Sequence, residues 1–233
     1  MKPPVLVLSC EHAVNTVPEK YTKYFAEYKD VLQTHRGVDL GALTIANHLS
    51  QVFACDIVCA QATRLLIDCN RRLSNPYVFS EITRNLTSEE KAHIIQEYYL
   101  PFREQLISTV RKHINAGQQV WHLSIHSFTP VFNDLVRDAD IGLLYDPKRS
   151  DERMLAKEWQ LRLKSHSSAL RVRMNYPYRG VTDGFTSFLR PEFTNDEYLG
   201  LEVEANQALT THPEASSNLC DTLAVTLKTL LRK

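Results

Sequence analysis

Residues 5–18 read VLVLSCEHAVNTVP, and this stretch sets the expectation for the fold. The apolar run at residues 5–8 is typical of a strand that is buried on both faces, as in a parallel sheet. Polar residues follow the run directly, because Cys10, Glu11 and His12 bring a thiol, a carboxylate and an imidazole to its exit. The sequence therefore predicts an N-terminal strand that delivers reactive side chains to one edge of a sheet.

Strand-like and helix-like segments alternate along the rest of the chain. Short apolar runs predict further strands at residues 55–60, 64–69, 119–128, 139–146, 170–175 and 198–205. Apolar spacing and capping residues predict helices at residues 39–53, 87 to about 117, 150–166 and 214–232, with Pro101 bending or dividing the second helix. This order favours a single three-layer α/β/α domain over residues 1–233, with a mostly parallel or mixed central sheet.

Composition narrows the class of protein. The 233 residues are 43% hydrophobic, and 27 basic residues balance 27 acidic ones, so no basic surface for nucleic acid or membrane is expected. No apolar run approaches the ~18 residues of a transmembrane helix, and the first ten residues are too short for a signal peptide. Five cysteines without CxxC spacing indicate a reduced, cytoplasmic protein. The oligomeric state stays open.

Reactive residues recur at the ends of the predicted strands. In a parallel sheet the carboxyl ends of the strands meet at one edge, where ligands bind, so His12 and His126 are expected to lie close together. Two histidines and a carboxylate with one open position form a hydrolytic zinc site. Glu204 is the candidate general base. Glu202 lies on the same strand face and is the alternative.

Plainer interpretations of the same residues remain. A histidine at a strand end can simply cap or pack, and Cys10 is more typical of an inert core thiol than of a nucleophile. Residues 68–72 can form an ordinary charged turn. Residues 202–204 can form a row of ion pairs at a sheet edge.

Five motifs together carry a resemblance to a known family. They are SCEHA (9–13), DLGA (39–42), RLLIDCNR (64–71), HSFTP (126–130) and LEVEANQ (201–207). In this order they resemble the N-formylglutamate amidohydrolase family over nearly the whole chain. That family is similar to the zinc carboxypeptidase-like group, which includes aspartoacylase and succinylglutamate desuccinylase. The resemblance implies a zinc-exopeptidase (phosphorylase/hydrolase-like) fold and the cleavage of a small amide.

The resemblance also implies a role for each matching residue. One zinc ion would be held by His12, Asp39 and His126, with Glu204 as the general base. Asn70 and Arg71 would bind a substrate carboxylate, which suits the planar fork of arginine. The further substrate contacts expected are Arg64, Ser127 and Arg179, and Arg64 or Arg179 would also stabilise the oxyanion.

Two departures from the pattern of its relatives bear directly on the site. Carboxypeptidases use His-x-x-Glu, but Asn15 stands at the third position after His12. The third ligand is therefore inferred to be Asp39, with Glu11 and His35 as alternatives.

The second departure is the loop at residues 176–197, which lacks the histidine-containing segment expected before the last strand in several members of the family. It is expected to frame the pocket, where Arg179, Asp183 and Arg190 could select the substrate. An ordinary lid with solvated charges is the alternative interpretation of this loop.

The sequence thus predicts a cytoplasmic, zinc-dependent amidohydrolase acting on an N-acyl amino acid or a similar small amide that bears a carboxylate. A peptidoglycan amidase or peptidase with the same site is the second interpretation. A non-catalytic small-molecule-binding relative is the third.

Overall fold

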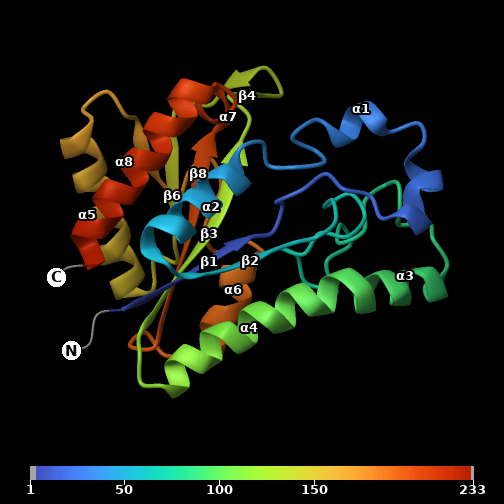
Figure 1. Ribbon diagram of the computed structural model, residues 1–233, viewed down its shortest axis with the longest axis horizontal. Coiled ribbons are helices and arrows are strands. Elements are labelled where there is room, and N and C mark those ends of the chain that lie inside the picture. Colours follow the sequence, from blue (N-terminus) through green and yellow to red (C-terminus); the bar gives the residue numbers. More distant parts are fainter. Residues whose placement is uncertain (1–3, 232–233) are drawn as a thin grey trace.

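A six-stranded sheet runs through the centre of the structure, a computed structural model that describes residues 4–231 (Figure 1). The strands, in their order across the sheet, are β2 (Asp56–Cys59), β1 (Val5–Cys10), β3 (Val120–Phe128), β8 (Tyr198–Asn206), β6 (Ile141–Leu144) and β7 (Val172–Met174). All neighbouring strands pair in parallel except β6 and β8, which are antiparallel. The predicted α/β fold with a mostly parallel, mixed sheet is confirmed.

Helices cover both faces of this sheet (Figure 1). One face packs against α2 (Ala42–Phe53), α5 (Ser150–His166) and α8 (Pro213–Leu231), and the other lies towards α4 (Leu100–Asn115) and α6 (Phe185–Leu189). The remaining short elements are η1 (Glu19–Phe25), α1 (Lys29–Leu32), α3 (Ser88–Ile94), η2 (Ile95–Tyr99), β4 (Val131–Phe132), β5 (Leu135–Val136), η3 (Arg190–Glu192) and α7 (Gln207–Thr210). Within residues 4–231, no helix combines the length and apolarity needed to cross a membrane.

The two faces of the sheet differ in chemistry. Successive residues of a strand point to opposite faces, and the face under α2, α5 and α8 is apolar, with Leu8, Leu123 and Val203 in its core. The opposite face carries buried polar side chains: Ser9, His122, Ser124, His126, Glu202 and Glu204. Register places Ser9, Ser124 and Glu202 in one row across three strands. The polar face supplies the candidate site.

The long helical segment between residues 88 and 115 is divided, as Pro101 predicted. A Thr87 capping box begins α3, and a π-helical turn, η2, separates it from α4, which has Pro101 in its first turn. Proline lacks the backbone N–H that would bond one turn back, and its ring clashes with that carbonyl. A π-turn is one way to absorb this interruption.

The strand predicted at residues 64–69 is wrong. This segment forms turns, although its apolar residues Leu66 and Ile67 are buried in a second apolar cluster, which also contains Phe102 and Leu106 of α4. Its backbone bonds go to the following loop: Thr83 Oγ1 donates to the carbonyl of Leu66, and Asp68 N donates to the carbonyl of Val78. Apolar content alone does not separate a strand from a buried turn whose polar groups are satisfied by side chains.

Candidate active site

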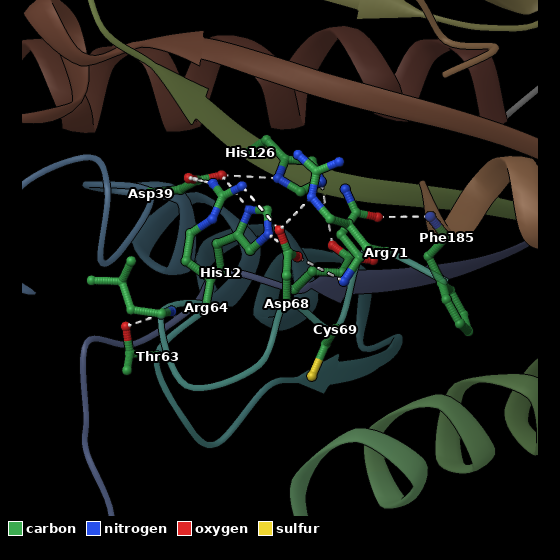
Figure 2. A network of polar contacts seen from close by, with 12 residues as sticks. His12, Asp39, Thr63, Arg64, Asp68, Cys69, Arg71, His126 and Phe185 are labelled. Atoms are coloured by element: carbon green, nitrogen blue, oxygen red, sulfur yellow. Dashed lines mark hydrogen bonds and ion pairs between the residues drawn. The ribbon is translucent and has the colours of Figure 1, made fainter. Parts of the chain in front are cut away.

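His12, Asp39 and His126 converge at the carboxyl ends of β1 and β3 (Figure 2). One ligand atom from each lies within 4.8 Å of the others, and all three residues are buried. Asp39 Oδ2 is 3.2 Å from His12 Nδ1 and 2.9 Å from His126 Nδ1. The two imidazole centroids are 5.0 Å apart. These three side chains could hold one metal ion.

The outer nitrogen of each imidazole has its own acceptor. His12 Nε2 lies 2.8 Å from Asp68 Oδ1, and His126 Nε2 lies 2.8 Å from Ser124 Oγ. Ser124 Oγ in turn donates to Glu11 Oε2 over 2.7 Å. Metal-binding histidines are commonly oriented this way, with the outer N–H bonded and the inner lone pair aimed at the ion. The geometry therefore directs both Nδ1 atoms to the same point.

The electrostatics of the cluster favour a cation there. Burial alone would lower the pKa of His126, but its hydrogen bond with Asp39 and the charges of Glu11, Asp39 and Glu204 raise that pKa to about 10. Burial and Arg64 oppose protonation of His12, yet Asp68 and Asp39 still raise its pKa. Both rings thus attract a second proton on their inner side. A metal ion would take the place of those protons.

The alternative third ligands lie elsewhere. Glu11 accepts hydrogen bonds from Ser9 Oγ and Ser124 Oγ, and its closest approach to His126 is to the outer Nε2, at 3.4 Å. The ring of His35 packs edge-on to Phe132 at the cavity wall. Asp39 is the carboxylate that faces both inner nitrogens.

Glu204 lies beside His126, with which it is in register across β3 and β8. It is only 5% exposed, and its Oε2 has no hydrogen-bond partner among the described residues. Burial, together with the charges of Asp39 and Glu202, outweighs the histidines and raises the pKa of Glu204 to about 7. A carboxyl group with this pKa can take up and release a proton near neutral pH.

Asp68 connects two arginines to the cluster (Figure 2). Its Oδ2 accepts hydrogen bonds from Arg64 Nη2 at 3.2 Å and Arg71 Nε at 3.1 Å, and Arg64 Nη1 also reaches Asp39 Oδ1 at 3.3 Å. Asp68 and Arg71 thus form an ion pair three residues apart in the chain. The two Nη groups of Arg71 make no hydrogen bond to residues 4–231, and its side chain is one-third exposed at the cavity.

A cavity of about 550 Å³ opens beside these residues, and most of the predicted substrate contacts line it. Those that line it are Arg64, Asn70, Arg71 and Ser127. Asn70 Oδ1 accepts from the backbone of Phe185, and Ser127 Oγ accepts from Gln207 Nε2.

The loop at residues 176–197 frames the cavity as expected, but with a different set of side chains. Arg179 is exposed and is not among the lining residues, whereas Tyr178, Thr182 and Asp183 are. Arg190, predicted as a selector, is buried in an ion pair with Glu152, so that prediction is wrong. Tyr178 was not predicted to line the cavity, since the path of the loop backbone decides which side chain does so.

Comparison with known proteins identifies the family to which the chain belongs. A family model described as N-formylglutamate amidohydrolase matches residues 5–210. A gene product from Agrobacterium tumefaciens is 29% identical with a TM-score of 0.78, over 97% of this chain and 92% of that one. An N-formylglutamate amidohydrolase from Ralstonia eutropha JMP134 shares the fold, at 19% identity and a TM-score of 0.73 over 100% and 94%. No curated protein sequence matches significantly. The chain belongs to the N-formylglutamate amidohydrolase family, and it is accordingly an amidohydrolase.

Proposed function

We propose that this protein is a zinc-dependent hydrolase that cleaves the amide bond of an N-acyl amino acid. The observation that carries the proposal is the buried His12–Asp39–His126 cluster with the unpartnered Oε2 of Glu204 beside it. Two imidazoles and one carboxylate, with room for a further ligand, are the donor set of catalytic zinc sites. A buried oxygen without a partner is costly unless a ligand or water meets it in the working enzyme.

In this proposal His12, Asp39 and His126 would hold the ion, with His12 Nδ1, Asp39 Oδ2 and His126 Nδ1 as the atoms that face one another. Zinc bound there would polarise the amide carbonyl and make a water molecule acidic. Glu204 Oε2 accepts the proton of the attacking water and then donates it to the nitrogen of the leaving amine. The pKa of Glu204, raised to about 7, suits both transfers.

The arginines take different roles. Arg71 offers its two free Nη groups to a substrate carboxylate, with the amide of Asn70 beside it, and this is the bidentate geometry that arginine supplies best. Arg64 is engaged by Asp39 and Asp68. It holds both carboxylates in place and adds positive charge where the oxyanion develops.

Two broader features fit the same proposal. Residues 4–231 pack around one sheet, which supports a single catalytic domain. All five cysteines, each within the described residues, are free, and this suits a reducing compartment such as the cytoplasm.

The decisive variant is Glu204→Gln. It should retain zinc, because Glu204 is not a ligand, and it should lose about 10²–10⁴-fold in kcat for an N-formyl amino acid. Metal content and turnover are measured on the same preparation, with exposed Glu192→Gln as the matched control. An unchanged kcat in Glu204→Gln would refute the proposed role.

A further inference from the structure

A buried carboxylate next to the candidate metal site has no part in the proposed reaction. Glu11 directly follows β1 and is only 1% exposed. Within residues 4–231 its one ion-pair contact is with Nε2 of His126, at 3.4 Å. Burying a carboxylate is costly unless hydrogen bonds and nearby charges compensate it. The groups that meet Glu11 therefore indicate what it does.

Two serine hydroxyls converge on this carboxylate. Ser9 Oγ donates to Glu11 Oε1 over 2.6 Å, and Ser124 Oγ donates to Glu11 Oε2 over 2.7 Å. Ser9 Oγ also lies 2.8 Å from His122 Nε2, and Ser124 Oγ lies at the same distance from His126 Nε2. A serine hydroxyl has one hydrogen to donate. Because Glu11 receives it in both cases, each imidazole must donate its Nε2–H to the serine oxygen.

The branch through Ser9 ends at Tyr198. Burial lowers the pKa of His122 to about 4, so its ring is neutral at ordinary pH and carries one ring hydrogen. With that hydrogen on Nε2, His122 Nδ1 accepts from the hydroxyl of Tyr198, 2.7 Å away. All the hydrogens of this branch therefore point towards Glu11. The branch occupies Oε1 of Glu11 and leaves Oε2 to Ser124.

The branch through Ser124 ends at His126. A neutral His126 that donates its Nε2–H to Ser124 keeps a lone pair on Nδ1, the atom 2.9 Å from Asp39 Oδ2. Ser124 alone does not enforce this ring form, because a hydroxyl can either donate to Nε2 or accept from it. A carboxylate can only accept, so Glu11 removes that freedom.

We propose that Glu11 is a positioning residue of the metal site. By accepting the hydrogen of Ser124, it holds His126 in the ring form whose inner nitrogen can bind an ion. This inference rests on the proposed function and adds to it a carboxylate that touches neither the ion nor the substrate. Partners of this kind strengthen metal binding by orienting the ligand.

The test compares the zinc affinities of wild type, Glu11→Met and Glu11→Gln by competition with a chelator. Methionine has a similar length but offers no carboxylate, so the hydrogen of Ser124 can turn to His126 Nε2. Zinc affinity should then fall ~10–100-fold. Glutamine keeps one acceptor oxygen for Ser124, so its loss should be measurable but smaller than that of Glu11→Met.

Two further variants separate positioning from a general loss of stability. Ser124→Ala removes the side chain that contacts His126 but leaves Glu11 Oε2 as the remaining acceptor, 3.4 Å from Nε2. It should therefore bind zinc more tightly than Glu11→Met. Glu152→Gln alters an equally buried carboxylate that does not line the cavity. It should lower the free energy of unfolding and leave zinc affinity unchanged.

The visible absorption spectrum of the cobalt-substituted protein reports the ligand arrangement without reference to activity. It should change in Glu11→Met and stay as in wild type in Glu152→Gln. Wild-type zinc affinity in folded Glu11→Met, or a greater loss in Ser124→Ala, would overturn the positioning role. Should Glu11→Met not fold, wild-type zinc affinity in Glu11→Gln would overturn it. Failure of the wild type itself to bind zinc would instead refute the proposed function.

Discussion

At the scale of single residues, Asp68 connects the two halves of the candidate site. One of its oxygens lies 2.8 Å from His12 Nε2, and the other accepts from Arg64 and Arg71. Its own burial would raise its pKa, but His12 and Arg64 outweigh burial and hold the pKa of Asp68 far below its ordinary value. The carboxylate therefore stays charged and fixes both the imidazole and the guanidinium.

Asp68→Asn should weaken metal binding by about 10–100-fold, the usual cost of losing an outer partner of a metal-binding histidine. Competition with a chelator measures the zinc affinity. The matched control is Asp56→Asn, which removes the partner of the surface residue His113 over a similar 2.8 Å contact. Equal zinc affinity in wild type and Asp68→Asn would contradict the orienting role.

Arg71→Ala should reduce transition-state binding by about 2–4 kcal/mol for substrates with a free carboxylate, because a charged partner is lost in a desolvated site. Arg71→Lys should also be impaired, since it keeps the charge but not the fork. Values of kcat/KM are compared for an N-acyl amino acid and its carboxamide. If wild type cleaves both equally well, Arg71 does not anchor the carboxylate.

At this scale the sequence was a good guide to which side chains converge. His12 and His126 could be paired because their types suit zinc and their strands end at one edge. Asp39 was placed at the start of the helix predicted over residues 39–53, but it lies in the loop before α2, and its role as a ligand came only from the family resemblance. The presence of Tyr178 in the cavity lining, in place of Arg179, depends on the backbone path of an irregular loop.

At the scale of elements, the loop at residues 176–197 is anchored from below. Arg190 Nε donates to Glu152 at 3.0 Å, and Arg190 Nη2 donates to the carbonyl of Gly200 at 2.9 Å. Gly142 in β6 lets the backbone of the loop pass close to this strand, because a Cβ there would lie 1.9 Å from the carbonyl oxygen of Tyr176. The cavity wall thus depends on a buried ion pair and a close backbone approach.

Arg190→Met should lower the free energy of unfolding by ~2–3 kcal/mol, because the fully buried Glu152 loses one of its two cations and keeps only Arg149, at 3.2 Å. Denaturant unfolding monitors the change. Arg111→Met is the control, since it breaks the exposed pair with Glu192 and should cost no more than ~1 kcal/mol. Similar losses in the two variants would argue against the anchoring role of Arg190.

Strands were predictable from their apolar runs whether long or short, since the short β2, β6 and β7 lie within the predicted ranges. The strands that carry His126 and Glu204 span nine residues each and were recognised. The six-residue run at 64–69 was mistaken for a strand, because Ser80 and Thr83 satisfy its carbonyls from a loop. Such partners are distant side chains that a local pattern does not reveal.

At the scale of the whole molecule, the two faces of the central sheet carry different side chains. Its apolar face packs against α2, α5 and α8 (Figure 1), while its polar face carries the histidines and glutamates of the candidate site. The layered fold followed from alternating strands and helices. The concentration of polar residues on one face depends on strand order and register, which join β1, β3 and β8 from distant parts of the chain.

Zinc titration of the metal-free enzyme shows whether catalysis depends on an ion held by His12, Asp39 and His126. The rate of hydrolysis of an N-formyl amino acid is followed as zinc is added back. We expect negligible activity without metal, a rise that saturates at one zinc ion per chain, and no such rise in a His126→Ala variant. Full activity in the metal-free protein, or an equal response to zinc in His126→Ala, would refute zinc-dependent catalysis at this cluster.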